Sequence, residues 1–500
     1  MNLDSNKLEM LRRSIADGLP EIDQSGATVE QPAAWTYVPP SHAKALDLDS
    51  AIVEGIRGAG KSFWWAALSS EKHRAFVANA FPELPIGKDV NILQGFGDAA
   101  TSLDAPSKDV LLRLLRGRKR PRSIWRAVVA HQLGFRGSFP GRTGTSETIW
   151  ADRTSWVDEN PETFDSLLSA VDSSLAKSGK TALIVFDALD RLAETWDDIR
   201  PLAKGLLQVA QDMRSTRHIR LKLFVRPDML EDKAIVGFPD ASKLLARKAT
   251  LSWRRVDLYA LFFQCVGNSN FGGSLLRDLT LDVANLHWKK ANGSWLTPVE
   301  LRSDETTQET VFEKLAGRAM SASPTGLKRG KPYKWVASHL QDGRGQVSPR
   351  SFCEALRRAA EQTLIDFPGY AYPLHFKAIQ AGVQAASSVR VNELIHEDYP
   401  WVDALMAPLK GELTVPCSPK DIGQIWQQKG VLKSIEANLR KSSNSVKLPP
   451  QHLVDGYEGV LMDLEELGLI QILRDGRVQM PDVFRIAFGL GRRGGVKPLK

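Results

Sequence analysis

The chain has 500 residues, of which 43% are hydrophobic and 25% are charged, and its formal net charge is +8. These values are typical of a globular protein with about three domains. The charge permits contact with nucleic acid or acidic partners without requiring it. No apolar run approaches the ~20 residues of a membrane-spanning helix. The N-terminus does not resemble a signal peptide. Cys265, Cys353 and Cys417 lack the spacing of a zinc site and favour a reducing compartment. We therefore expect a cytoplasmic protein without membrane contact.

The N-terminal residues 1–45 are expected to be an appendage or linker. Apolar residues at helical spacing predict one amphipathic helix over residues 7–16. Residues 20–41 are rich in Pro, Ser, Gln and Thr, which is typical of an extended linker or clamp.

Residues 55–62, with the sequence GIRGAGKS, match the pattern G-x-x-x-x-G-K-[ST] of a phosphate-binding loop. Glycines let the backbone curl so that successive N–H groups point into one concavity. Lys61 can reach the β- and γ-phosphates of a nucleotide, and the Ser62 hydroxyl can bind Mg²⁺. An apolar run at 51–53 and an apolar helix at 63–68 provide the strand–loop–helix setting that the motif requires. The residues expected to contact the nucleotide are Gly55, Ile56, Arg57, Gly58, Ala59, Gly60, Lys61, Ser62 and Phe63.

A second strand is expected over 89–97, and the chain then runs from 110 to 146 without an acidic residue. The basic residues of this segment are Arg113, Arg116, Arg118, Lys119, Arg120, Arg122, Arg126, Arg136 and Arg142. One interpretation is a solvated basic helix whose apolar face packs inward. The other is a surface for nucleic acid, for nucleotide phosphate or for an acidic neighbouring subunit. Trp125 is available to stack on a base, although a single buried Trp is more commonly part of the core.

The apolar run at 181–186 predicts a strand that is buried on both faces of a parallel sheet. Asp187 follows this strand directly, at the position where a carboxylate is needed to hold Mg²⁺. A further strand over 218–225 ends at Arg226, and a short one lies at 249–253. Strands that alternate with helices predict a doubly wound parallel sheet of the α/β class. Ligands in such sheets bind at the carboxyl ends of strands, where residues 55–62, Asp187 and Arg226 all fall.

The second half of the chain is expected to be mainly helical. Ser348 and Pro349 favour a helix start, as N-cap and first helical residue, with Arg350 next. Residues 441–450 are linker-like, and a helix over 453–467 precedes a hairpin around Asp475-Gly476. A helix followed by a two-stranded wing is the pattern of a winged helix. The tail carries Arg492, Arg493, Lys497 and Lys500.

The ordered set of motifs resembles the AAA+/STAND group of P-loop ATPases. It comprises the loop at 55–62, FDALDR at 186–191, VRP at 225–227 and LSW at 251–253. The stretch 187–191 is similar to that of KAP-type members, and Ser348-Pro349-Arg350 resembles the start of the sensor 2 helix in KAP and origin-initiator ATPases. The resemblance covers residues 46–365 well and the C-terminal domain loosely. It implies an ATPase that uses ATP and Mg²⁺, forms a homo-oligomer and acts with an effector protein, and it implies a role in anti-phage defence or mobile elements.

The chain departs from this group at Ala188, because AAA+ enzymes usually have a glutamate there that positions the attacking water. Either Asp190 takes that role, or hydrolysis is slow and the nucleotide acts mainly as a switch. Asp190 as a helix N-cap before Leu192 is an equal alternative. Arg191 is either a finger for a neighbouring subunit or the ion-pair partner of Asp190.

We therefore expect a P-loop NTPase core at 46–254, a helical lid at 255–365 and a helical and winged-helix domain at 366–500. The candidate catalytic residues are Lys61, Asp187, Asp190, Arg226 and Arg350, and the candidate Mg²⁺ ligands are Ser62 and Asp187. Arg226 is expected to sense the γ-phosphate and Arg350 to reach it from the lid. The predicted function is a regulatory ATPase that switches an effector protein, in anti-phage defence. The alternative is a DNA-bound initiator or transposition regulator that uses the basic segment and the winged helix, and a third class is a kinase.

Overall fold

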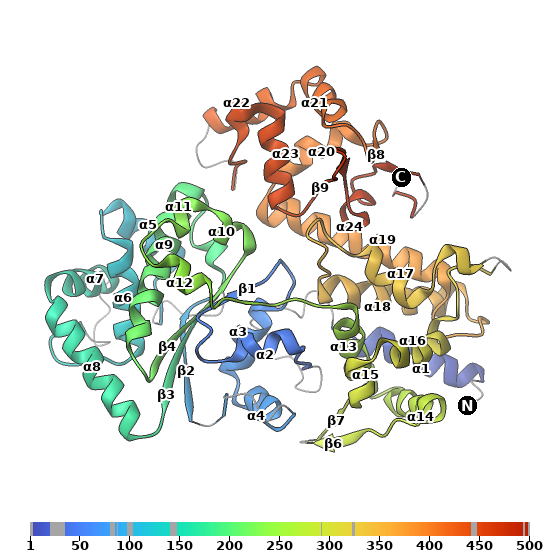
Figure 1. Ribbon diagram of the computed structural model, residues 1–500, viewed down its shortest axis with the longest axis horizontal. Coiled ribbons are helices and arrows are strands. Elements are labelled where there is room, and N and C mark those ends of the chain that lie inside the picture. The colour runs from blue at the N-terminus through green and yellow to red at the C-terminus, as the bar shows by residue number, and fades with distance from the viewer. Residues whose placement is uncertain are drawn as a thin grey trace. The chain divides into compact units, whose positions relative to one another are not determined.

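The computed structural model describes residues 4–20, 36–80, 86–87, 89–97, 104–140, 148–291, 293–322, 326–441, 448–493 and 496–498 (Figure 1). It divides into two compact units. Val38–Leu251 form the first unit, and Ser252–Lys500 together with the N-terminal helix form the second. Most of the predicted linker at 20–41, most of the run at 441–450, Arg142 and Lys500 lie outside the described residues.

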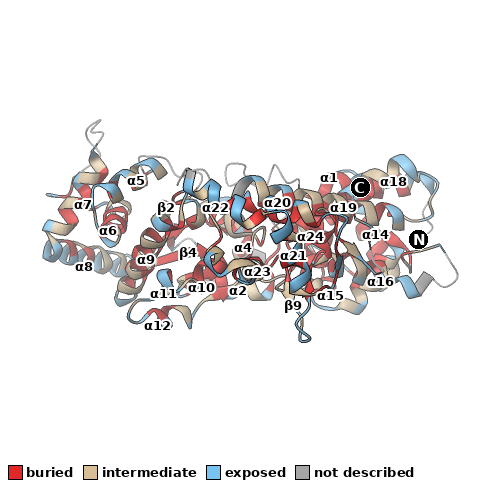
Figure 2. Ribbon diagram, turned by 90° about the horizontal axis from the view of Figure 1, so that it is seen from above, coloured by how far each residue is buried: buried red, intermediate tan, exposed pale blue. Residues whose placement is uncertain are grey.

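The first unit is built on a five-stranded parallel sheet with the strand order β2-β3-β4-β1-β5. Its strands are β1 (Ile52–Glu54), β2 (Val90–Phe96), β3 (Thr181–Phe186), β4 (Ile219–Val225) and β5 (Ala249–Thr250). All neighbouring strands of this sheet run parallel. The strands β3 and β4 are buried along nearly their whole length. Figure 2 shows β4 mainly in the colour of buried residues. The predicted α/β class with a parallel sheet is confirmed.

The register of the sheet aligns the carboxyl ends of three strands. Glu54 of β1 lies opposite Val225 of β4, and Phe186 of β3 lies opposite Leu223 of the same strand. The residues that follow these strands therefore begin at one edge of the sheet. These are the loop from Gly55, the turn from Asp187 and the segment from Arg226. This edge is where ligands bind in open parallel sheets.

Helices of the first unit pack against the sheet and against one another. They are α2 (Pro40–Leu46), α3 (Lys61–Ser69), α4 (Glu71–Ala80), α5 (Lys108–Arg116), α6 (Pro121–Gln132), α7 (Ile149–Glu159), α8 (Pro161–Lys177), α9 (Trp196–Asp212), α10 (Pro227–Glu231), α11 (Lys233–Val236) and α12 (Ala241–Leu245). The Trp125 ring of α6 meets Phe96 and Phe186 edge-on, at 6.0 and 5.9 Å between ring centroids. Its Nε1 donates to the Leu202 carbonyl of α9 at 2.8 Å. Trp125 is thus a fully buried core residue, and the interpretation that it stacks on a base is wrong.

A lysine lies in the core of this unit. Lys222 of β4 is completely buried, and its Nζ donates to the carbonyls of Ala45, Asp47 and Ser50 at 2.7, 2.8 and 2.8 Å. These hydrogen bonds hold the segment before β1 against β4. Burial lowers the pKa of Lys222 to about 7, against the opposing effect of Asp47 and Asp49.

Replacing Lys222 by methionine is expected to lower the free energy of unfolding by about 2 kcal/mol or more, because buried carbonyls lose their donor. The folded-state pKa of about 7 lies below the ordinary value of 10.5, so between these values the unfolded chain binds more protons than the folded one. The contribution of Lys222 to the free energy of unfolding therefore rises with pH between about pH 7 and pH 10.5, and this rise is absent in Lys222→Met. Urea unfolding at several pH values measures both effects. Exposed Lys177→Met on α8 is the control, and equal stability of the two variants contradicts the prediction.

The second unit is mainly helical, and the N-terminal helix belongs to it. Its first part contains α1 (Ser5–Gly18), α13 (Arg255–Gly267), α14 (Gly273–Ala284), β6 (Lys289–Ala291), β7 (Ser294–Leu296), α15 (Val299–Ser303), α16 (Glu305–Ala316), α17 (Pro332–His339), α18 (Pro349–Asp366) and α19 (Phe376–Glu393). Helix α1 packs against α18. The buried Arg12 guanidinium of α1 donates to the carbonyls of Pro368, Tyr370, Tyr372 and Pro373, which tie the helix to the α18–α19 connection.

The C-terminal part of this unit holds short strands among helices. It comprises α20 (Trp401–Met406), β8 (Thr414–Val415), α21 (Pro419–Gln428), α22 (Val431–Lys441), α23 (Gly456–Glu466), β9 (Gln471–Ile472), β10 (Val478–Gln479), α24 (Asp482–Arg485) and β11 (Gly491–Arg492). The strands β9 and β10 form the hairpin predicted around Asp475-Gly476, where Gly476 has a φ of 81°. Among the described residues, no helix combines the length and the apolar character that crossing a bilayer requires.

Candidate nucleotide-binding site

The loop after β1 reverses the chain and starts α3 at Lys61. Gly58 and Gly60 have φ values of 75° and 103°, in the left-handed region that favours glycine. A Cβ on Gly60 would meet nothing within 4 Å, so backbone conformation, and not space, requires glycine there. The loop is anchored to the sheet by Gly55 N, which donates to the Val225 carbonyl at 3.0 Å. This is the strand–loop–helix geometry that the sequence motif predicts.

The Lys61 side chain folds back over this loop. Its Nζ donates to the carbonyls of Gly55 and Ile56 at 2.8 and 3.0 Å. Burial lowers the pKa of Lys61 to about 8, and the nearby carboxylates of Asp190 and Asp187 oppose this effect. The amine is therefore held at the loop by hydrogen bonds that phosphate oxygens can replace. The predicted contact residue Phe63 faces Trp64 and His73 edge-on, at 5.2 and 6.3 Å between ring centroids.

Asp187 and Ser62 come together from different elements. Asp187 is 3% exposed, and its backbone N donates to the Phe96 carbonyl at 2.9 Å. Burial raises the pKa of Asp187, while the hydrogen bond from Ser62 and the charge of Lys61 act in the opposite direction. A hydroxyl and a carboxylate oxygen at one point are the hard ligands that Mg²⁺ prefers. These two residues thus fit the predicted metal ion.

Asp190 forms an ion pair with Arg226 across two strand ends. The distance from Arg226 Nη1 to Asp190 Oδ2 is 3.1 Å, and the side chains are 10% and 15% exposed. Burial acts to raise the pKa of Asp190, but the positive charges of Arg226, Lys61 and Arg191 outweigh it and leave that pKa lowered. Asp190 lies inside a 3-10 helix, Leu189–Arg191, whose N-cap residue is Ala188. The interpretation of Asp190 as a helix N-cap is therefore wrong.

Ala188 has φ and ψ of 56° and 36°, a left-handed conformation that non-glycine residues adopt rarely. The turn at Ala188 sends the chain back so that Asp190, and not residue 188, pairs with Arg226. The residue that stands where a glutamate is expected, Ala188, therefore has a left-handed backbone conformation and does not continue the extended conformation of β3. Strain of this kind concentrates at functional sites.

Two acidic residues of this region were missed by the sequence interpretation. Asp228 Oδ1 accepts from Arg226 Nε at 3.1 Å, so the guanidinium is held between two carboxylates. Glu54, the last residue of β1, accepts from Lys248 and Thr250 at 2.8 and 3.1 Å and fixes the chain at the start of the loop. The tripeptide Arg-Pro-Asp was a local signal for Asp228, but nothing in the sequence pattern identified the partners of Glu54.

Arg350 lies in the second unit, at the start of α18. The predicted cap is present, since the Ser348 side chain accepts from Ser351 N at 3.5 Å. Arg350 Nη1 pairs with Glu393 Oε1 of α19 at 2.8 Å. The contact of Arg350 with a nucleotide stays a prediction.

Several arginines of the basic segment have carboxylate partners from other helices. Arg120 pairs with Asp158 at 2.6 Å, Arg122 with Asp212 at 2.7 Å and Arg126 with Asp165 at 2.7 Å. The apolar side chains of α5 and α6 point inward, as the solvated-helix interpretation predicts. These ion pairs neutralise part of the positive charge. A nucleic-acid surface on this segment stays a prediction.

No protein-family model and no curated protein matches the sequence. Among solved structures, Cdc6p from Pyrobaculum aerophilum is similar at 12% identity, over 92% of this chain and 94% of that chain, with a TM-score of 0.30. The ORC2 protein of Aeropyrum pernix, in ADPNP and ADP complexes, is similar at 12% identity over 90% and 94%, with a TM-score of 0.29. These TM-scores are too low for the likeness to assign a function to this chain.

Proposed function

We propose that the first unit binds and hydrolyses ATP with Mg²⁺, as an ATPase of the AAA+ kind. The observation that carries this proposal is the convergence of Lys61, Ser62, Asp187, Asp190 and Arg226 at one edge of a parallel sheet. These residues come from three separate segments of the chain, which follow β1, β3 and β4. Their combination of an ammonium, a hydroxyl, two carboxylates and a guanidinium is what transfer of a γ-phosphoryl group to water requires.

Each residue has a defined role in this proposal. The loop cradles the phosphates, and the Lys61 ammonium exchanges its bonds to loop carbonyls for bonds to phosphate oxygens. Ser62 and Asp187 would hold Mg²⁺, which neutralises charge on the phosphate oxygens. Arg226 reaches the γ-phosphate by leaving one of its two carboxylate partners. That exchange frees Asp190 to accept a hydrogen bond from the attacking water.

The experiment that tests this proposal measures phosphate release from ATP by the full chain, with and without an added phosphoryl acceptor. An ATPase releases inorganic phosphate at the same rate in both cases. A kinase would release little phosphate until the acceptor is present, and that outcome contradicts the proposal. Replacing Mg²⁺ by EDTA must stop the reaction in either case, because the developing charge is then unscreened.

We further propose that the nucleotide state acts on a partner, with residues 255–365 as a lid that carries Arg350. The partner is either DNA, as for an initiator-type ATPase, or an effector protein. One structural feature favours the initiator-type ATPase. A bridge between Cys417 and Val478 adds a third segment to the β9–β10 hairpin, beside the helices α21 to α23. This is the combination of elements that a winged helix contains. An effector-switching role in defence rests on the sequence resemblance alone.

A duplex-binding titration at increasing salt tests the initiator-type setting. Helix α23 carries Glu458, Asp463, Glu465 and Glu466 and no basic residue, so duplex contacts would come from the wing, where Arg474 is exposed. A duplex-binding protein loses about 0.9 log units of affinity per log unit of salt for each phosphate contacted. Arg474→Glu is expected to lower that slope by about one. Weak duplex binding whose affinity does not depend on salt contradicts the initiator-type proposal and favours a winged helix that contacts proteins.

A further inference from the structure

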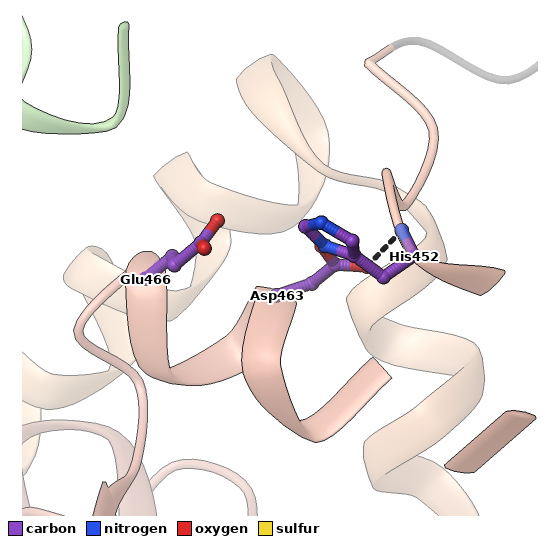
Figure 3. A group of neighbouring side chains, drawn as sticks. All are labelled: His452, Asp463 and Glu466. Carbon is purple, nitrogen blue, oxygen red and sulfur yellow. Dashed lines mark hydrogen bonds and ion pairs between the residues drawn. The ribbon is translucent and has the colours of Figure 1, made fainter. Parts of the chain in front are cut away.

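A group of metal-ligating side chains lies in the second unit, and no step of the proposed ATPase uses it. His452 lies on the turn before α23, and Asp463 and Glu466 lie one helical turn apart on α23 (Figure 3). One ligand atom from each residue lies within 4.8 Å of the others. Both carboxylates project from the side of α23 that the imidazole faces, as Figure 3 shows.

The group is an acidic, partly dehydrated environment. Asp463 is 4% exposed, and its carboxylate accepts from His452 Nδ1 at 2.7 Å and from His452 N at 3.1 Å. The hydrogen bond to Asp463 raises the pKa of His452 against the effect of burial, and the charges of Glu466 and Asp455 add to it. Three carboxylates therefore act on one imidazole.

We propose that His452, Asp463 and Glu466 bind one divalent transition-metal ion, with Zn²⁺ as the best fit. An imidazole nitrogen combined with carboxylate oxygens is a zinc-type ligand set, whereas Mg²⁺ and Ca²⁺ prefer oxygen ligands in larger number. The ion takes the place of the proton between His452 Nδ1 and Asp463 Oδ1. From the imidazolium that proton passes to solvent and Nε2 keeps its own, whereas in a neutral ring the proton moves to Nε2. Three protein ligands leave a fourth position for water.

The geometry requires only a small adjustment. Ligand atoms around a tetrahedral zinc ion lie roughly 3.3 Å apart, given metal–ligand distances of about 2.0–2.1 Å. Metal binding therefore requires the 2.7 Å separation of His452 Nδ1 and Asp463 Oδ1 to lengthen, and the ligand atoms that lie up to 4.8 Å apart to move closer. The bound ion would join the turn at His452 to the C-terminal part of α23, the helix that leads into the β9–β10 hairpin.

The test uses the full chain, treated with chelator and free of nucleotide, in excess Mg²⁺ so that Ser62 and Asp187 do not compete for Zn²⁺. Calorimetric titration with ZnCl₂ and elemental analysis give affinity and stoichiometry, and Co²⁺ absorbance reports the coordination number. We expect about one Zn²⁺ per chain, a loss of at least about 10-fold in affinity for Glu466→Gln, and no binding for Asp463→Asn. The three cysteines are buried, which limits binding of Zn²⁺ to them.

Glu458→Gln is the matched control, because Glu458 is exposed on the same helix and its replacement changes the charge equally. Zn²⁺ binding that survives in Glu458→Gln and fails in Glu466→Gln supports the site. Absence of bound Zn²⁺ in the parent chain overturns the proposal. Equal Zn²⁺ affinity of the parent, Glu458→Gln and Glu466→Gln also overturns it, as does an equal loss of affinity in Glu458→Gln and Glu466→Gln. Circular dichroism of each variant shows that it folds, which Glu466→Gln is expected to do because its side chain is half-buried.

Discussion

ATP binding is expected to weaken by about 100-fold when Lys61 is replaced by alanine. A hydrogen bond to a charged group contributes about 1.5–3 kcal/mol, so two such bonds to phosphate oxygens are worth at least about 3 kcal/mol. Each 1.4 kcal/mol corresponds to about a tenfold change in affinity. The variant is expected to fold, because the change removes a buried cation whose pKa burial already lowers. Calorimetric titration with ATP measures the loss.

The pH dependence of the parent chain provides a second measure of the same residue. Because the pKa of Lys61 in the free protein is about 8, the amine loses its proton as pH rises past this value. Binding of the phosphates then requires proton uptake, so affinity for ATP falls above about pH 8, and Lys61→Ala lacks this fall. Lys72→Ala, an exposed change on α4, is the control and keeps the parent affinity. Lys61→Ala that binds ATP as tightly as the parent would falsify the proposed site.

Turnover of ATP is expected to fall by roughly 100-fold or more in Asp187→Asn, while binding of ATP measured without Mg²⁺ stays close to that of the parent. The amide keeps the size of the carboxylate but lacks the charge that Mg²⁺ needs, and metal stabilisation of the transition state is worth several kcal/mol. Burial already raises the pKa of Asp187, so a neutral side chain is tolerated there without loss of stability. Phosphate release at saturating ATP gives the rate.

Asp190→Asn distinguishes two roles of Asp190, which are to position the attacking water and to hold Arg226. If Asp190 accepts a hydrogen bond from the attacking water, turnover falls while Mg²⁺-dependent binding of ATP is kept. If it only holds Arg226, the released guanidinium binds the γ-phosphate more readily, and affinity for ATP rises. Exposed Asp197→Asn on α9 is the control for the charge change. Turnover at the parent rate in Asp187→Asn contradicts the assignment of the metal ligand, whatever Asp190 does.

The sequence predicts the parts of this protein that depend on neighbouring residues. The run Ala182–Phe186 is apolar without interruption, and it lies in a strand that is buried along these residues. The glycines at 58 and 60 adopt the left-handed conformation that the loop motif demands. Asp475-Gly476 forms a hairpin because the turn depends only on its own backbone angles. Local signals of this kind also identified Lys61, Ser62 and Asp187.

The tertiary structure decided which charges pair. Asp190 and Arg226 are separated by 36 positions in the chain and meet because β4 lies beside β3 in the sheet, an order that no local pattern specifies. The same holds for Lys222, which is one of two basic residues in the sequence of β4 and donates to three backbone carbonyls. The basic segment is neutralised in part by acids of α7, α8 and α9, which the charge run itself cannot show. Periodicity and turn chemistry act over a few residues, whereas ion pairs depend on which elements become neighbours.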